Sequence, residues 1–222
     1  MNRGSLLLAL DTSTSTAGVA VYDGRQVLSE TTWRAGREHS TRLMIEIDAA
    51  LSRVGHAASD LTGLVVARGP GSYTGVRVAL SVAKGMAAAL GVPLWGVGSL
   101  DVLAHAAGQV DLMIRAVLEA GRGRFATAAY LDGQCTEPAR LATLDELTRV
   151  LAGASDQVLV VGELSHEARA RLGTETSVRL ASPAACLRRS GFLAELGWRL
   201  RVAGDPGDPS AVDAVYVGVG TA

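Results

Sequence analysis

The sequence predicts an α/β protein in which three antiparallel strands are followed by alternating helices and strands. Short continuous apolar runs, typical of strands buried on both faces, recur along the chain. Longer segments between them carry apolar residues at helical spacing. The pair Asp23-Gly24 separates two of the first strands and is typical of a tight hairpin.

The first half of the chain carries the stronger signals. Its predicted elements are, in order, strands at 6–10, 17–22 and 26–32, a helix at 40–54, a strand at 64–67, a helix at 75–90, a strand at 94–97 and a helix at 100–107. Ser40 or Thr41 can cap the first helix, and Gly91 with Pro93 ends the second. This order is that of the ribonuclease-H-like fold shared by actin-like ATPases and sugar kinases (the ASKHA fold).

The second half is predicted to be a reduced second lobe of the same fold. Its predicted elements are strands at 113–119 and 125–131 around a turn at 121–123, a helix at 143–151, a strand at 158–161, a helix at 183–202 and a final apolar stretch at 214–219. We expect an N-terminal lobe over 1–110 and a smaller C-terminal α/β lobe over 111–222, which fits the length of 222 residues. The sequence contains no internal repeat.

Composition argues against several classes of protein. With 21 Lys+Arg against 22 Asp+Glu, the net charge of -1 gives no electrostatic reason for the chain to bind nucleic acid by itself. Aromatic residues make up only 4%, so a base-stacking platform is not expected. The apolar run before Asp11 is too short for a signal peptide core or a membrane span. Cys135 and Cys186 form no metal or disulfide motif, so we expect a cytoplasmic protein.

Asp11 closes the first strand and is followed by Thr12, Ser13 and Thr14. Such a turn can offer hydroxyls and N–H groups to phosphate while the carboxylate holds a hydrated metal, which makes these four residues a candidate nucleotide site or its remnant. The alternative is that the same groups satisfy the backbone of a turn. A matching glycine-rich phosphate loop is not found in the second half, where 161–165 is the nearest segment and does not fit.

A glycine-rich loop precedes the second helix. It is not a Walker loop, because the required lysine is missing. A loop of this kind can either bind an anion at the start of a helix or pack closely as a strand-to-helix turn, and the sequence leaves both interpretations open. The residues of this motif are Gly69, Pro70, Gly71, Ser72, Tyr73, Thr74, Gly75 and Arg77.

The second helix is apolar almost all round, apart from a narrow stripe with Arg77, Ser81 and Lys84. Such a helix must be buried on most sides, either within its own lobe or against another chain. We expect a partner interface on the first two helices, which would also hold a homodimer when the chain is alone. The candidate interface residues are His39, Leu43, Ile47, Val76, Ala79, Leu80, Ala83 and Met86.

The histidines do not support a metal or hydrolase site. None of them falls at the spacing of a metal pair on one helix, and there is no G-x-S-x-G nucleophile elbow. We therefore expect no metal site and no catalytic residue.

Four segments in order carry a family resemblance: LALDTST at 8–14, REHS at 37–40, RGPGSYTGVR at 68–77 and GVGSL at 96–100. Together they resemble the TsaB (YeaZ) family of bacterial tRNA threonylcarbamoyladenosine biosynthesis proteins. The resemblance is close over residues 5–110 and concerns only the layout beyond them.

The resemblance implies a non-catalytic scaffold or activating subunit that binds the ligase TsaD. That ligase moves a threonylcarbamoyl group from threonylcarbamoyl-adenylate to the adenosine beside the anticodon of tRNAs that read codons beginning with A. TsaE, a P-loop ATPase, would join the assembly, and tRNA would be bound only through the complex. No membrane partner and no strongly bound cofactor are implied, with ATP or ADP a candidate at the partner interface.

Two other functions remain open from the residues alone. An actin-like ATPase or small-molecule kinase would need the missing second phosphate loop. A glycoprotease-like peptidase would need a nucleophile and a base brought together in space.

Overall fold

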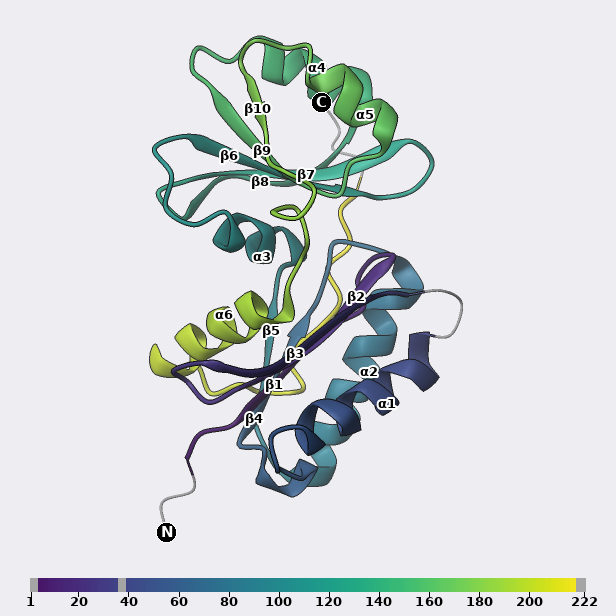
Figure 1. Cartoon of the computed structure of the whole chain (residues 1–222), viewed down its shortest axis with the longest axis vertical. Helices are drawn as coiled ribbons and strands as arrows, with labels where there is room; N and C mark the ends of the chain where they lie inside the picture. The colour runs from purple at the N-terminus through teal and green to yellow at the C-terminus, as the bar shows by residue number, and fades with distance from the viewer. Residues whose placement is uncertain (1–3, 36–38, 219–222) are drawn as a thin grey trace. The chain divides into compact units, whose positions relative to one another are not determined.

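The computed structural model describes residues 4–35 and 39–218, without the side chains of 39–41. The chain forms two compact units (Figure 1). Unit 1 comprises Met1–Ser99 and Arg189–Val215, and unit 2 comprises Leu100–Arg188 and Tyr216–Ala222.

Unit 1 is built on a five-stranded sheet in the order β3-β2-β1-β4-β5. The three N-terminal strands form an antiparallel meander, and β4 and β5 continue the sheet parallel to β1. The strands are β1 (Leu7–Asp11), β2 (Thr16–Tyr22), β3 (Val27–Arg34), β4 (Gly63–Ala67) and β5 (Leu94–Val97).

Helices cover both faces of this sheet (Figure 1). The helices α1 (His39–Ser52) and α2 (Tyr73–Leu90) pack on one face, and α6 (Ser190–Val202) packs on the other. A short 3-10 helix, Ala58–Asp60, precedes β4. Because both faces are covered, all five residues of β1 are buried, which explains its continuous apolar sequence.

Unit 2 has its own five-stranded sheet in the order β10-β9-β6-β7-β8. Its strands are β6 (Met113–Glu119), β7 (Arg124–Leu131), β8 (Gln134–Thr143), β9 (Val158–Gly162) and β10 (Val178–Leu180). The helix α3 (Ser99–Ala106) packs on the strand residues Ile114, Ala116 and Leu118. The helices α4 (Leu144–Ala152) and α5 (His166–Leu172) pack on a separate cluster around Val117 and Val160.

The two units share one topology although the sequence shows no repeat. In each, three antiparallel strands are followed by two strands that run parallel to the first. The helices that end the two series are exchanged: α3 follows the last strand of unit 1 and packs in unit 2, whereas α6 follows the last strand of unit 2 and packs in unit 1. An ASKHA-type α/β fold of two lobes is therefore confirmed.

The exchange changes the expected division of the chain. The boundary predicted at residue 110 assumed two contiguous lobes, but the contacts divide the chain after Ser99 and return 189–215 to unit 1. The helix predicted at 183–202 begins only at Ser190 and belongs to unit 1. The apolar stretch predicted at 214–219 contains no strand up to residue 218, where the description ends.

Three elements of unit 2 were not predicted. Strand β8 is exposed at most positions and contains Pro138, so it lacks the apolar alternation of a strand. Helix α5 has seven residues and β10 has three, too few to show a period. Over the described residues, no helix combines the length and apolarity needed to cross a bilayer.

Close packing of α6 on the sheet depends on Gly197, where a Cβ would lie 2.2 Å from Val65 Cγ2. We expect Gly197→Ala to lower the free energy of unfolding by about 1–3 kcal/mol, because the added methyl forces the helix off the strand. The matched control is Gly85→Ala on α2, where a Cβ would meet nothing within 4 Å. It should raise stability by about 0.5–1 kcal/mol, since alanine favours the helix. Urea denaturation of both variants measures this, and equal effects would contradict the packing assigned to α6.

Candidate functional site

The candidate site lies at the carboxyl edge of the sheet of unit 1. Because β4 and β5 run parallel to β1, the residues that follow these three strands meet at this edge, where α/β sheets commonly bind ligands. They are the turn at 12–15 between β1 and β2, the glycine loop at 69–75, and Ser99 at the start of α3.

The polar groups of this turn bind one another and the glycine loop. Asp11 Oδ1 accepts hydrogen bonds from Ser13 N (2.8 Å) and Ser13 Oγ (2.5 Å). Ser99 Oγ in turn donates to Ser13 Oγ at 3.0 Å. Thr12 Oγ1 donates to the Gly75 carbonyl at 2.6 Å. A buried chain of hydrogen bonds thus links β1, the turn and α3.

The glycine loop lies directly against the turn. A Cβ on Gly71 would be 2.1 Å from the Ser13 carbonyl oxygen, and one on Gly75 would be 2.0 Å from that of Thr12. Ser72 N donates to the same Ser13 carbonyl at 2.6 Å, and the Ser72 hydroxyl caps α2 by accepting from Gly75 N at 3.3 Å. Only glycine fits at 71 and 75, so the structure favours close packing over anion binding for these two positions.

Burial completes the picture of the turn. Asp11 is 2% exposed, Thr12 and Ser13 are 0% exposed, and Thr14 is 5% exposed. The Thr14 hydroxyl accepts from Thr16 N at 3.1 Å. The predicted nucleotide-binding residues are thus brought together as buried groups that bind within the chain, whereas Ser15 at the end of the turn is exposed. Ser99 was not predicted as part of this group. Its position directly after the strand at 94–97 was the signal in the sequence that it lies at the same edge of the sheet.

The turn predicted at 121–123 in unit 2 is topologically equivalent to the turn after β1, a relation that was not predicted from the sequence. The turns after β1 and β6 both span four residues, 12–15 and 120–123, and Glu119 ends β6 as Asp11 ends β1. The segment at 161–165 instead follows β9 and is not a hairpin.

The turn after β6 differs from its counterpart in exposure and charge. Residues 119–124 are all exposed, and Gly121, Arg122 and Gly123 have positive φ angles of 74°, 53° and 69°. It therefore presents an arginine where the turn of unit 1 buries hydroxyl groups. The signal available in the sequence was the equal length of the two turns, once β6 and β7 were recognised as a hairpin.

The residues predicted as a partner interface prove mostly internal. Six of them pack in the core of unit 1 at 0–7% exposure: Leu43, Ile47, Val76, Ala79, Leu80 and Ala83. Met86 is partly buried against the same core, and the side chain of His39 lies outside the described residues. Buried side chains cannot contact another chain, so this assignment is wrong for the six. Both the inward and the outward faces of α1 and α2 carry apolar residues. Helical spacing could not tell the two faces apart, so the residues chosen for the interface belong to the inward face.

The exposed apolar side chains of the two helices lie elsewhere. Met44 and Ile45 on α1 are 49% and 62% exposed, and Tyr73 on α2 is 56% exposed. The Arg77 guanidinium lies 3.8 Å from the centre of the Tyr73 ring, a cation–π distance.

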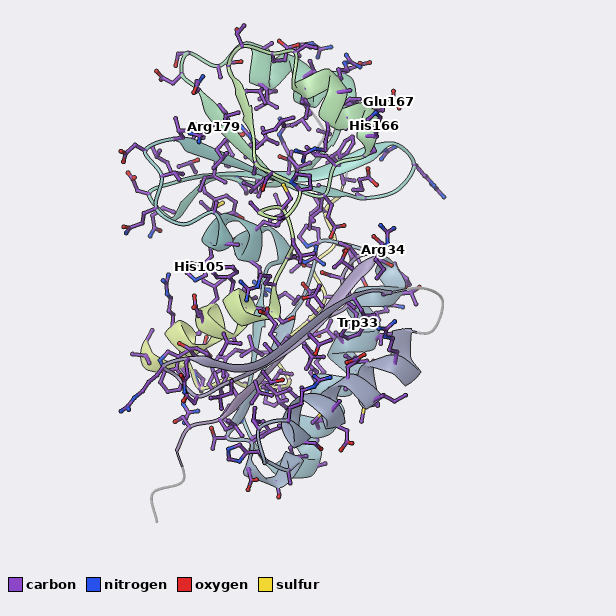
Figure 2. The ribbon with its side chains drawn as sticks, viewed as in Figure 1. Trp33, Arg34, His105, His166, Glu167 and Arg179 are labelled. Carbon is purple, nitrogen blue, oxygen red and sulfur yellow. The ribbon has the colours of Figure 1, made fainter. Side chains whose placement is uncertain are left out.

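Metal ligands do not gather in the part of the chain that the structure describes. His105 lies on α3 and His166 on α5 (Figure 2), and no group of three or more His, Cys, Asp or Glu side chains within that part could hold a metal ion.

The topology and the site define a chain with the actin-like ATPase fold. Component A of (R)-2-hydroxyglutaryl-CoA dehydratase from Acidaminococcus fermentans shares this fold, with a TM-score of 0.55 at 12% identity over 89% of this chain and 99% of that one. YeaZ from Pseudomonas aeruginosa is more similar, with a TM-score of 0.77 at 26% identity over 96% of this chain and 100% of that one.

Sequence comparison gives the family. A family model described as "TsaD: tRNA N6-adenosine threonylcarbamoyltransferase" matches residues 31–186. The chain belongs to this family, in its TsaB/YeaZ group.

Two curated relatives are both named tRNA threonylcarbamoyladenosine biosynthesis protein TsaB. The Bacillus subtilis protein is 38% identical over 124 residues, which are 56% of this chain and 54% of that protein. The Escherichia coli protein is 32% identical over 126 residues, with the same shares. The chain thus spans about half the length of these curated relatives.

The correction on α2 is tested by two arginine substitutions on the same helix. Ala83 is 0% exposed, so Ala83→Arg should cost several kcal/mol and leave the protein largely unfolded, because a guanidinium would be buried without a partner. Ala88 is exposed, and Ala88→Arg should melt like the wild type. Thermal melts followed by circular dichroism measure both. A folded Ala83→Arg variant with an unchanged melting temperature would overturn the internal assignment.

Proposed function

We propose that the chain is a non-catalytic subunit of the complex that adds threonylcarbamoyl to tRNA, and that it acts by binding a TsaD-like ligase. The observation that carries this proposal is the contact between the turn at 12–15 and the glycine loop. The hydroxyls of Thr12, Ser13 and Thr14, which follow the first strand, are buried and hydrogen-bonded within the chain. The chain therefore has the fold of actin-like ATPases, but the hydroxyls of Thr12, Ser13 and Thr14 are not open to a phosphate.

The partner surface follows from the exposed side of α1. A fully apolar pair at 44 and 45, about half exposed or more, is unusual on a helix whose inward face is already covered. Together with Tyr73 on α2 it supplies the apolar and aromatic side chains typical of interface centres. We assign the ligase contact, and a homodimer in the absence of the ligase, to Met44, Ile45 and Tyr73.

The remaining partners belong to the assembled complex. A TsaE-like ATPase would join it, and ATP or ADP would bind at the interface with the ligase rather than at the closed turn of this chain. A strongly bound cofactor in the isolated chain is not part of the proposal.

Ile45→Arg tests the partner surface. Ile45 is 62% exposed, so the variant should keep the wild-type melting temperature. Binding to the TsaD-like ligase of the same cell should weaken by about 30-fold or more, roughly 2 kcal/mol, because the guanidinium would be desolvated at the interface. Isothermal titration calorimetry with the purified ligase measures the change.

The matched control is Val202→Arg on α6, since Val202 is another strongly exposed aliphatic side chain among the described residues of unit 1, at 70%. It should bind the ligase as the wild type does. Normal binding by Ile45→Arg would refute the surface, and failure of the wild type to bind the ligase would refute the function itself.

A further inference from the structure

One end of unit 2 carries four arginines that belong to three consecutive elements. Arg122 and Arg124 lie in and beside the turn between β6 and β7, Arg140 lies on β8, and Arg149 lies on α4. We call these four residues the basic patch. Three of them are exposed and Arg140 is half-buried.

Strand register places Arg124 and Arg140 three residue pairs apart on β7 and β8, at the end of the two strands that leads into α4. Arg124 at the start of β7 is paired with Thr143 at the end of β8. Thr143 is the N-cap of α4, and its backbone and hydroxyl groups bind Glu146 Oε2 at 2.7 and 3.0 Å. These hydrogen bonds from Thr143 lower the pKa of Glu146, and the nearby charges of Arg140 and Arg149 lower it further. Arg140 and Arg149 therefore lie near the cap whose Thr143 is paired with Arg124.

Three other arginines of unit 2 are held in ion pairs. Arg115 pairs with Glu137 at 2.7 Å, Arg171 with Asp145 at 2.6 Å and Arg188 with Glu163 at 2.8 Å. For the four patch arginines, the described part of the chain holds no ion pair within 4.0 Å. The Glu146 carboxylate, which lies near Arg140 and Arg149, accepts two hydrogen bonds from Thr143 at the cap.

Backbone hydrogen bonds define the turn that carries Arg122. The hairpin is closed on both sides, by Ala120 N donating to the Arg124 carbonyl at 2.8 Å and by Arg124 N donating to that of Gly121 at 3.1 Å. Arg122 sits at its tip with a φ of 53°, a conformation that non-glycine residues adopt uncommonly. Exposed guanidinium groups on a stiff turn match the bidentate geometry of phosphate oxygens.

We infer that the basic patch contacts the phosphate backbone of the tRNA when the chain is assembled with its ligase, an inference that rests on the proposed function. Such a contact is sequence-independent, because contacts to phosphate oxygens carry no sequence information directly. The contact is also limited to this patch. With a net charge of -1, the whole chain has no excess of positive charge that could bind RNA in the absence of the ligase.

The test is tRNA binding by the assembled complex of this chain with the TsaD-like ligase, measured by fluorescence anisotropy across a salt series. Arg122→Glu should weaken binding roughly tenfold and lower the slope of log affinity against log salt by about one, as expected for one lost phosphate contact. Arg122→Lys, which keeps the charge, should retain most of the affinity. The matched control is Arg179→Glu, the same charge reversal at an exposed arginine on β10, at the other edge of the sheet (Figure 2). It should change neither quantity.

Ligase binding is measured separately for each variant, so that the inference and the proposed function can fail independently. Equal tRNA affinity and salt slope for Arg122→Glu and wild-type complexes would overturn the inference and leave the function intact. A loss of ligase binding by Arg122→Glu, with normal tRNA binding at saturating ligase, would make the patch a protein contact and also overturn it. If the wild-type chain and ligase do not associate, the function fails and the inference fails with it.

Discussion

The close contact between the glycine loop and the first hairpin turn is the constraint on which unit 1 depends. Two carbonyl oxygens, of Thr12 and Ser13, lie where the Cβ atoms of Gly75 and Gly71 would be. This contact fixes the start of α2 and, through the Ser13–Ser99 hydrogen bond, the start of α3. Asp11, which closes the first strand beside this contact, is buried and binds Ser13 within the chain.

The duplicated topology explains how one chain can carry two turns with opposite properties. Both turns follow the first strand of their sheet and have the same length. In unit 1 the glycine loop lies against the turn. The segment at 163–165 that follows β9 contains no glycine, and its Glu163 pairs with Arg188. An uncovered turn is free to carry arginines, which is the physical basis for assigning the RNA contact to unit 2.

Much of unit 1 could be predicted from the sequence, because its strands are buried on both faces and appear as apolar runs. The strand at 94–97 and the strand at 113–119 coincide with the observed β5 and β6. Strand β8 could not be predicted, since an exposed edge strand lacks a buried face. The exchange of α3 and α6 depends on contacts between residues far apart in sequence, such as Gly197 and Val65, which periodicity does not report.

For the candidate site, the sequence identified the right loops but not their relation. Asp11 and the glycine motif were both recognised. Only the structure shows that the turn after Asp11 contacts the glycine loop directly. On α2, nearly uniform apolarity could not separate the inward side from the outward side, so Ala79 and Ala83 were taken for surface.

The most direct test of the central claim is threonylcarbamoylation of tRNA reconstituted from the TsaD-like ligase, threonylcarbamoyl-adenylate and this chain carrying Asp11→Asn. The amide keeps an oxygen that can accept the hydrogen bonds from Ser13, and the account gives the carboxylate no chemical role. It therefore predicts that the modification depends on the chain and that folded Asp11→Asn supports it at the wild-type rate. A folded, ligase-binding Asp11→Asn variant that leaves the tRNA unmodified would contradict the account.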